Sequence, residues 1–205
     1  FVMLVSLPFA WMYLLPISFE DFSKSILYSL GFISNFYFWS ITQVYGAESG
    51  LYKPFLHTWS LSVEEQFYII FPLICTLLYY LTKKRYSYVV LILFLFSLFL
   101  NSTNQTNDKF YFIQYRAWEF LLGVLIMLIG RTYKTKYIKN IGFLIMVFGC
   151  FYFTDSQINQ IEPKLFVLFG TSLFLMFEPH GYLEQVINNK VIKYIGLSSF
   201  SIYLI

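Results

Sequence analysis

The sequence has 205 residues, of which 58% are hydrophobic and 12% are charged, and its formal net charge is +3. An ordinary soluble domain carries roughly a quarter charged residues, so this composition excludes a typical water-soluble globule. The small positive excess gives no sign of a nucleic-acid partner.

Apolar runs recur along the whole chain and are separated by short polar stretches. A bilayer core is spanned by about 20 apolar residues, and flanking tyrosine, tryptophan, serine and threonine extend each run to about that length. We therefore predict an all-α fold, a polytopic transmembrane helical bundle with about eight helices. The predicted segments are Phe1 to Ile17, Ser23 to Ile41, Trp59 to Thr82, Tyr86 to Leu100, Tyr111 to Gly130, Ile141 to Phe153, Lys164 to Phe177 and Tyr194 to Ile205. Both ends fall inside apolar runs, so we expect the first and last segments to be incomplete.

Basic residues gather in the connections on one side of the predicted bundle. If successive connections alternate sides, one side holds ten of them: Lys24, Lys83, Lys84, Arg85, Arg131, Lys134, Lys136, Lys139, Lys190 and Lys193. The other side holds Lys53, Lys109 and Lys164, while Arg116 lies within a span. Lysine and arginine concentrate in cytoplasmic loops, so the loop Gln43 to Thr58 is predicted to lie outside the cytoplasm.

The signatures of soluble enzymes are missing from the sequence. It has no phosphate-binding glycine loop, no G-x-S-x-G motif and no pair of histidines at metal-ligand spacing. Cys75 and Cys150 both fall within predicted spans, where a small apolar packing role is the default. We expect no metal ion and no bound cofactor.

A polar run from His57 to Tyr68 opens one of the predicted spans. In one interpretation Ser62 and Glu65 form a capping box at the helix N-terminus, where acidic side chains are favoured. In the other, Glu64 faces into the bundle, where a carboxylate is a functional candidate by default. Both interpretations stay open at this point.

A second polar group lies near the outer end of the segment Tyr111 to Gly130. Arg116 and Glu119 are three residues apart and can pair on one helical face as an internal salt bridge. Alternatively, Arg116 joins Glu64 and His57 at the same membrane face, in a cluster able to orient a base or bind an anion.

The run from His57 to Tyr68, followed by Pro72, closely resembles the signature of the acyltransferase family 3 membrane proteins, which include polysaccharide and lipopolysaccharide O-acetyltransferases. Weaker matches are Ser34-Asn35, Arg116 to Glu119 with Gly123, and Ser198 to Ile205. The resemblance covers the whole chain. It implies that residues 1–205 are part of a transmembrane domain of about ten helices, with N-terminal helices and the C-terminal end missing.

The resemblance also implies an activity. Such enzymes take an acyl group, usually acetyl from cytoplasmic acetyl-CoA, and place it on a hydroxyl of an extracytoplasmic glycan such as O-antigen. The implied partners are acyl-CoA, the glycan acceptor and the lipid bilayer, and the implied location is a bacterial inner membrane. An arginine and a histidine in the family's first helix precede Phe1, so we expect the chain to be inactive alone.

The predicted catalytic residues are Glu64, His57, Arg116 and Glu119. In this hypothesis a histidine activates the acceptor hydroxyl, Glu64 orients it and Arg116 stabilises negative charge. The predicted substrate-binding residues are Trp59, Ser60, Glu65, Gln66, Tyr68 and Trp118. Two alternatives are a glycan or lipid transporter, in which buried Arg–Glu pairs are common, and a noncatalytic membrane scaffold.

Overall fold

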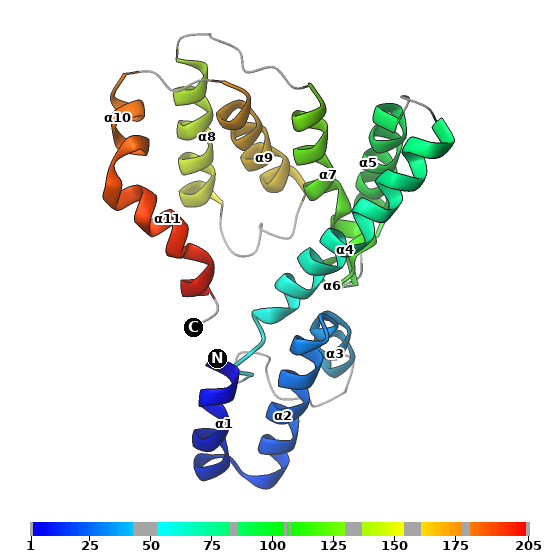
Figure 1. The fold of residues 1–205 in the computed structure, drawn as a ribbon, viewed down its shortest axis with the longest axis vertical. Coiled ribbons are helices and arrows are strands. Elements are labelled where there is room, and N and C mark those ends of the chain that lie inside the picture. Colours follow the sequence, from blue (N-terminus) through cyan, green and yellow to red (C-terminus); the bar gives the residue numbers. More distant parts are fainter. Residues whose placement is uncertain are drawn as a thin grey trace. The chain divides into compact units, whose positions relative to one another are not determined.

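A computed structural model of the chain describes residues 2–42, 53–82, 86–104, 106, 108–129, 137–153, 161–177 and 181–203. These residues form α-helices and contain no β-strand, so the predicted all-α class is confirmed for them (Figure 1). The helices are α1 (Val2–Tyr13), α2 (Pro16–Leu30), α3 (Ser34–Thr42), α4 (Thr58–Thr82), α5 (Tyr86–Thr103), α6 (Asp108–Tyr111), α7 (Ile113–Ile129), α8 (Ile138–Tyr152), α9 (Ile161–Met176), α10 (Tyr182–Asn188) and α11 (Lys190–Tyr203).

The helices divide into two compact units. The first unit holds α1 to α4 and α6, and the second holds α5, α7 from Arg116 onward, and α8 to α11.

Among the described residues, α4 is the helix that is long and apolar enough to cross a membrane, over Thr58–Leu81. Shorter apolar helices cover Val2–Tyr13, Ser87–Thr103 and Ile138–Tyr152. A helix rises about 1.5 Å per residue, so a helix as short as α8 covers about 22 Å of a hydrocarbon core about 30 Å thick. The structure therefore supports one of the eight predicted crossings by length and composition.

Proline sets the boundary between the first two helices. α1 ends at Tyr13 and α2 has Pro16 in its first turn, where the missing N–H of proline has no cost. α2 therefore begins well before the predicted Ser23, and the predicted segment Phe1 to Ile17 extends past the end of α1.

The predicted single span Ser23 to Ile41 is wrong. Gly31 ends α2, Phe32 adopts a left-handed φ of 55°, and α3 then begins at Ser34. Gly31 stands within an otherwise apolar run, so the hydrophobic pattern continues across the turn and hides it. Two short helices joined by a turn replace the expected long one.

α3 runs back along α2. The rings of Tyr28 and Tyr37 stack with their centroids 4.7 Å apart. The Tyr37 hydroxyl donates to the backbone carbonyl of Asp21 at 3.1 Å, near the start of α2. We call α2 and α3, with the turn between them, the α2–α3 hairpin.

The residues just before α4 return to the start of α2. Lys53 Nζ lies 2.8 Å from Asp21 Oδ2, and the ring of Phe55 lies 5.4 Å from that of Phe22. Lys24 is one helical turn from Asp21, so Lys24 and Lys53 lie at the same end of the first unit. The prediction that these two lysines lie on opposite sides is therefore wrong.

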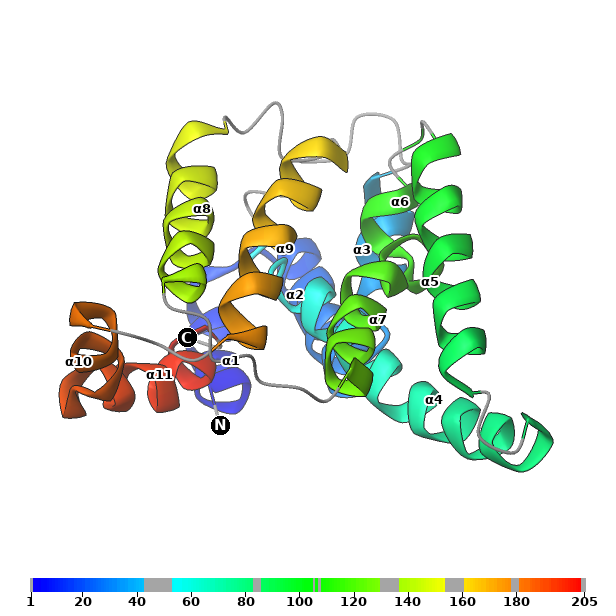
Figure 2. The same ribbon diagram turned by 90° about the horizontal axis from the view of Figure 1, so that it is seen from above.

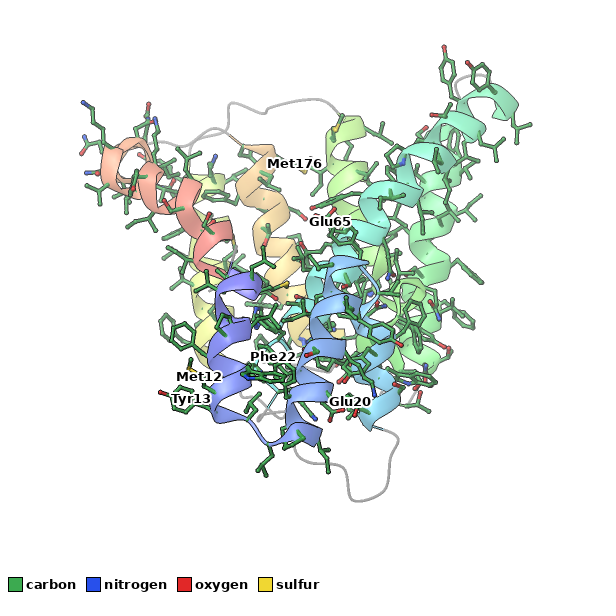
Figure 3. The ribbon with its side chains drawn as sticks, turned by 60° about the horizontal axis from the view of Figure 1, so that its bottom comes forward. Met12, Tyr13, Glu20, Phe22, Glu65 and Met176 are labelled. Carbon is green, nitrogen blue, oxygen red and sulfur yellow. The ribbon has the colours of Figure 1, made fainter. Side chains whose placement is uncertain are left out.

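Apolar clusters hold the first unit together. One consists of Ala10, Phe22, Ile26 and Phe55, and a second consists of Tyr37, Phe38 and Tyr111. Figure 3 shows Phe22 between α1 and α2, whereas Glu20 lies on the other side of α2.

In the second unit, α8 and α9 pack side by side (Figure 2). Glycines allow this close approach: a Cβ atom at Gly142 would lie 2.7 Å from the carbonyl oxygen of Gly170. A Cβ atom at Gly149 would lie 2.6 Å from a methyl group of Val167. The two helices thus meet through their backbones, which fixes the position of the residues at the start of α9.

Candidate functional site

The first group of predicted site residues lies around the start of α4. His57 precedes the helix and is half-buried, with its Nε2 atom buried. The Ser60 hydroxyl donates to the His57 carbonyl oxygen at 3.2 Å, which ties this residue to the first turn. Glu64 and Glu65 lie in the second turn and are both half-buried.

The capping-box interpretation of Ser62 and Glu65 is wrong. The Leu56 N–H donates to the Lys53 carbonyl and the Thr58 N–H donates to the Phe55 carbonyl, so turns lead directly into α4, which begins at Thr58. Ser62 therefore lies one turn inside the helix, where it is 1% exposed.

Four buried hydroxyls join the α2–α3 hairpin to α4. Ser29 Oγ lies 2.7 Å from Thr58 Oγ1, and Thr58 donates to Ser34 Oγ at 3.2 Å. Ser34 Oγ in turn lies 2.7 Å from Ser62 Oγ. Each hydroxyl can donate one hydrogen bond and accept others, so this set satisfies its own polar atoms in a buried environment. It holds the start of α4, and with it His57, against the hairpin.

Gln66 also supports the hairpin. Its Nε2 atom donates to the Phe32 carbonyl at 2.7 Å and to Asn35 Oδ1 at 2.9 Å, and Asn35 Nδ2 donates to the Tyr111 carbonyl at 3.0 Å. Both amide protons of Gln66 are thus used in hydrogen bonds. Donation from Gln66 to a substrate would require the loss of its hydrogen bond to the Phe32 carbonyl or to Asn35.

The two aromatic residues predicted in this run have different surroundings. The ring of Trp59 lies 4.1 Å from that of Phe110 and 5.6 Å from that of Tyr111, so it packs among aromatic residues of α6. Tyr68, in contrast, is 58% exposed on α4. The structure thus gives Trp59 a packing role beside its predicted one.

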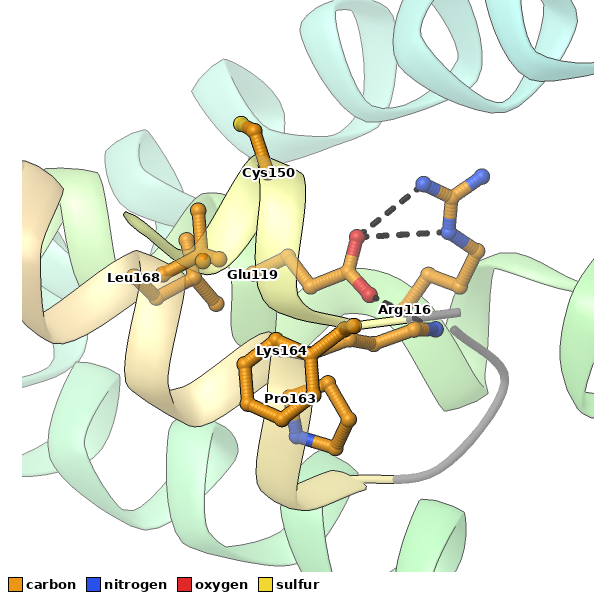
Figure 4. A pocket seen from close by; sticks show the side chains of 9 residues that line it. Arg116, Glu119, Cys150, Pro163, Lys164 and Leu168 are labelled. Carbon is orange, nitrogen blue, oxygen red and sulfur yellow. Dashed lines mark hydrogen bonds and ion pairs between the residues drawn. The ribbon is translucent and has the colours of Figure 1, made fainter. Parts of the chain in front are cut away.

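The second group of predicted site residues lies at the start of α7. Glu119 Oε2 accepts hydrogen bonds from Arg116 Nη2 at 3.0 Å and from Arg116 Nε at 3.3 Å, so the predicted pair is confirmed. The other oxygen, Oε1, accepts a hydrogen bond from Lys164 Nζ at 3.3 Å (Figure 4). One carboxylate therefore binds two cations, and the cluster carries one net positive charge.

Sequence reasoning missed Lys164. Its signal was its place at the outer end of a predicted span, the same end as Arg116, but nothing in the spacing joined two segments so far apart in the chain. Lys164 lies in the first turn of α9, and its hydrogen bond to Glu119 joins that turn to α7.

An apolar cavity of about 440 Å³ adjoins the Arg116–Glu119–Lys164 cluster. It is lined by Arg116, Glu119, Gly149, Cys150, Phe153, Pro163, Lys164, Val167 and Leu168. The side chains of the three charged residues are 16% to 23% exposed, so water screens them only partly. A cavity of this size and composition can take a small ligand with an apolar part and a polar or anionic part.

Trp118 lies between Arg116 and Glu119 in the sequence and is fully buried. Its backbone N–H donates to Ser97 Oγ at 3.0 Å, which links α7 to α5. Trp118 is not among the residues that line the cavity, and its predicted contact with substrate stays a prediction.

The structure brings together Arg116 and Glu119 in the second unit, and His57, Glu64 and Glu65 lie near one another in the chain of the first unit. The predicted convergence of Arg116 with His57 and Glu64 joins residues of different units and stays a prediction. The described residues contain no group of three histidine, cysteine, aspartate or glutamate side chains that could hold a metal ion.

Comparison with known proteins identifies the family. Residues 2–205 match the sequence model of acyltransferase family 3, which is described as "Acyltransferase domain". The chain belongs to this acyltransferase family. The matched range contains both the polar run around the start of α4 and the Arg116–Glu119–Lys164 cluster.

Relatives in this acyltransferase family come from several bacteria. A candidate O-acetyltransferase of Staphylococcus aureus strain COL is 30% identical over 202 residues, which cover 87% of this chain and 33% of that protein. Peptidoglycan O-acetyltransferase OatA of Listeria monocytogenes is 25% identical over 228 aligned positions, which cover 100% of this chain and 36% of that protein. An uncharacterized protein of Haemophilus influenzae is 29% identical over 167 residues, or 73% of this chain and 68% of that protein.

The chain spans about a third of the length of the Staphylococcus and Listeria acyltransferase relatives. No solved structure matches it.

Proposed function

We propose that this chain is part of a membrane-bound O-acyltransferase that moves an acyl group, acetyl in the simplest case, from cytoplasmic acyl-CoA to a hydroxyl of an extracytoplasmic glycan. O-antigen, another cell-surface polysaccharide or peptidoglycan would serve as acceptor. Membership of the acyltransferase family and the names of the Staphylococcus and Listeria relatives support O-acetyl transfer. The domain would be a polytopic bundle in a bacterial inner membrane.

The observation that carries this proposal is the Arg116–Glu119–Lys164 cluster beside the apolar cavity. When a hydroxyl attacks a thioester carbonyl, a C–O bond forms, negative charge develops on the carbonyl oxygen, and the C–S bond then breaks. Cationic donors that are already in place stabilise this charge, and they act most strongly where water is partly excluded. The apolar wall would hold the acyl group next to them.

Proton transfer completes the reaction. The acceptor hydroxyl gives its proton to a base, and the departing CoA thiolate takes up one proton, so the overall reaction is balanced. A histidine is the natural base because its pKa lies near neutral pH. In this scheme His57 and Glu64 serve at the acceptor side, whereas Glu119 positions Arg116 and Lys164.

Exposed leucines support a membrane location for α4. Leu73, Leu77 and Leu81 are 68%, 58% and 70% exposed and lie four residues apart, so they form a continuous apolar stripe on one face of the helix. A water-soluble protein rarely exposes such a stripe without a partner.

The basic residues still favour one orientation after Lys24 is moved to the side of Lys53. One side then holds Lys83, Lys84, Arg85, Arg131, Lys134, Lys136, Lys139, Lys190 and Lys193. The other holds Lys24, Lys53, Lys109 and Lys164. Because basic residues concentrate in the cytoplasm, α4 would run from the outer face at His57 to the cytoplasmic face at Lys83.

Mass spectrometry of surface glycans tests the proposal. Deleting the gene for the full-length protein should remove one acetyl group per repeat, and the wild-type gene should restore it. Genes carrying Glu64→Gln or Arg116→Gln should not restore it, although the proteins insert in the membrane. Glycans that keep their acetyl groups but no longer reach the surface would favour the transporter alternative.

A further inference from the structure

The first unit contains a second cavity, which no predicted site residue lines. Its volume is about 400 Å³, and it lies between the start of α2 and the residues that precede α4. It is lined by Leu14, Ser18, Asp21, Phe22, Ser25, Lys53 and Pro54. Pockets of this size bind small molecules or single rings of larger ones.

The charges in this cavity cancel. Lys53 Nζ lies 2.8 Å from Asp21 Oδ2, and their side chains are 14% and 39% exposed. A neutral pair gives little net attraction for either an anion or a cation. The cavity therefore differs from the cationic Arg116–Glu119–Lys164 cluster, and it suits a ligand without net charge.

The pair nevertheless has hydrogen-bonding capacity to spare. An ammonium group has three donors and a carboxylate has about four acceptor positions, while the described residues give each of these side chains a single hydrogen bond, the one that joins them. The hydroxyl of Ser18 adds a further donor and acceptor at the wall. Neighbouring hydroxyls on a ligand, which both donate and accept, match this arrangement.

The remaining wall is apolar apart from Ser25, whose hydroxyl donates to the Phe22 carbonyl. Phe22 packs against Phe55 at a centroid distance of 5.4 Å, and Leu14 and Pro54 lie at the edge of the cavity. A ligand that presents an apolar face to Phe22 and a hydroxyl edge to Asp21 would satisfy both kinds of surface. A sugar ring has these two faces.

The cavity shares its wall with the segment that carries His57. Phe55 lies between the two, with its ring centroid 5.4 Å from that of Phe22 and 6.3 Å from that of His57. Lys53 and Pro54 line the cavity, and the turns that follow lead directly to His57. A ring bound in the cavity would therefore contact residues that come just before His57, the candidate base, in the sequence.

We propose that this cavity binds one neutral sugar ring of the acceptor glycan, with Asp21 and Lys53 contacting its hydroxyls and Phe22 contacting its apolar face. This inference rests on the proposed function for the name of the ligand, since the chain would need a glycan as acceptor. Beyond that function, the cavity gives the glycan a binding position, and its balanced charges favour an uncharged ring.

Direct binding to the full-length protein in lipid nanodiscs tests this without any acyl donor. The probe is tetra-N-acetylchitotetraose, a neutral oligosaccharide, and a sulfated heparin tetrasaccharide serves as the anionic comparison. Saturation-transfer NMR with a titration gives the dissociation constant. The wild type should bind the neutral probe and not the sulfated one, and Asp21→Asn and Lys53→Met should each weaken binding by about tenfold through loss of a charge-assisted hydrogen bond.

The chain offers a matched control on the same helix. Glu20 and Lys24 form an exposed ion pair of 2.6 Å that does not line the cavity, so the double variant Glu20→Gln, Lys24→Met should bind the probe as the wild type does. Ser18→Leu fills the cavity without touching the ion pair and should also abolish binding. This variant keeps the test valid if Asp21→Asn fails to fold.

Several outcomes would overturn the inference: no binding of the neutral probe by the wild type, preference for the sulfated probe, or equal binding by all variants. These results are independent of catalysis. If the variants lose binding but deletion of the gene leaves glycan acetylation unchanged, the proposed function fails and the sugar site stands. If acetylation requires the gene but the Asp21 and Ser18 variants bind normally, the reverse holds.

Discussion

The two cavities are built from the same kinds of residue and differ by one charge. In the first unit, Asp21 pairs with Lys53 and the charges cancel. In the second, Glu119 pairs with both Arg116 and Lys164, so these three side chains together carry one net positive charge. A single additional lysine, contributed by a distant segment, separates a site suited to a neutral ligand from a site suited to developing negative charge.

The environments of the two pairs differ as well. Asp21 is 39% exposed, whereas Glu119 is 16% exposed. Water screens a charge less as exposure falls, so Glu119 is screened less than Asp21. The basic side chains are similarly buried in the two sites, at 14% exposure for Lys53, 19% for Arg116 and 23% for Lys164, so the sites differ chiefly in net charge. We therefore expect the Arg116–Glu119–Lys164 cluster to affect the rate of transfer, and the Asp21–Lys53 pair to affect the affinity for acceptor.

The largest expected effect separates these roles in kinetics. Arg116→Gln in the full-length protein should lower kcat by about 10² to 10³, the usual effect of removing one donor from a transition-state oxyanion. Asp21→Asn should instead raise the KM for acceptor and leave kcat near the wild-type value. Initial acetyl-transfer rates over a range of acceptor concentrations measure both.

A kcat that falls as far for Asp21→Asn as for Arg116→Gln would contradict this division. The exposed pair supplies the control, because Lys24→Gln alters a charge near the first cavity without lining it and should change neither constant.

The next effect concerns the packing of α8 against α9, the helix that carries Lys164. Gly142→Ala places a methyl group 2.7 Å from the Gly170 carbonyl oxygen and 2.8 Å from the Phe174 nitrogen. Forcing α8 and α9 apart should lower the free energy of unfolding by about 1–3 kcal/mol, as overpacking does elsewhere. Thermal unfolding of the purified protein in detergent measures the change.

Gly123→Ala is the matched control for that variant. Apart from its chain neighbours and the backbone of its own helix, no heavy atom of the described residues lies within 4 Å of its added Cβ, and the residue is within α7. Alanine should therefore raise stability by up to about 1 kcal/mol through its better helix propensity. Equal losses for both variants would show that the contact between α8 and α9 is not close.

The smallest expected effect probes the hydroxyls of the first unit. Ser62→Ala removes the partner of the buried Ser34 hydroxyl at 2.7 Å and should cost about 1 kcal/mol of unfolding free energy. Ser102→Ala removes a hydroxyl that is exposed and bonds only to the carbonyl one turn back, so it should change stability much less. If both substitutions are neutral, the hydroxyls do not hold α4 to the hairpin.

Hydrophobic pattern was enough to predict most helices of this chain. The predicted segments Trp59 to Thr82 and Tyr86 to Leu100 match α4 and α5 within a few residues, because polar stretches mark their ends. The same rule failed for Ser23 to Ile41, where the turn at Gly31 and Phe32 is as apolar as the helices beside it. A turn without polar residues leaves no mark in the hydrophobic pattern.

Some contacts of the candidate site could be predicted from the sequence, and others could not. The Arg116–Glu119 pair could be predicted because three residues on one helix suffice to bring the side chains together. Lys164 and the Asp21–Lys53 pair could not, since each depends on how separate helices pack. The capping-box interpretation of Ser62, one of the two left open, was wrong because a capping box and a buried interhelical contact use the same residue types.

The α2–α3 hairpin changes how the gene product would be oriented in a cell. Because Asp21 and Lys53 form an ion pair at one end of the first unit, both residues would lie on the same side of the membrane, and the segment between them would add no net membrane crossing. Reporter fusions make this visible: an alkaline phosphatase moiety, which is active only after export, should be active when fused after Phe22 and again after Pro54. The same moiety fused after Thr82 should stay inactive, while a green fluorescent protein there should fold and fluoresce.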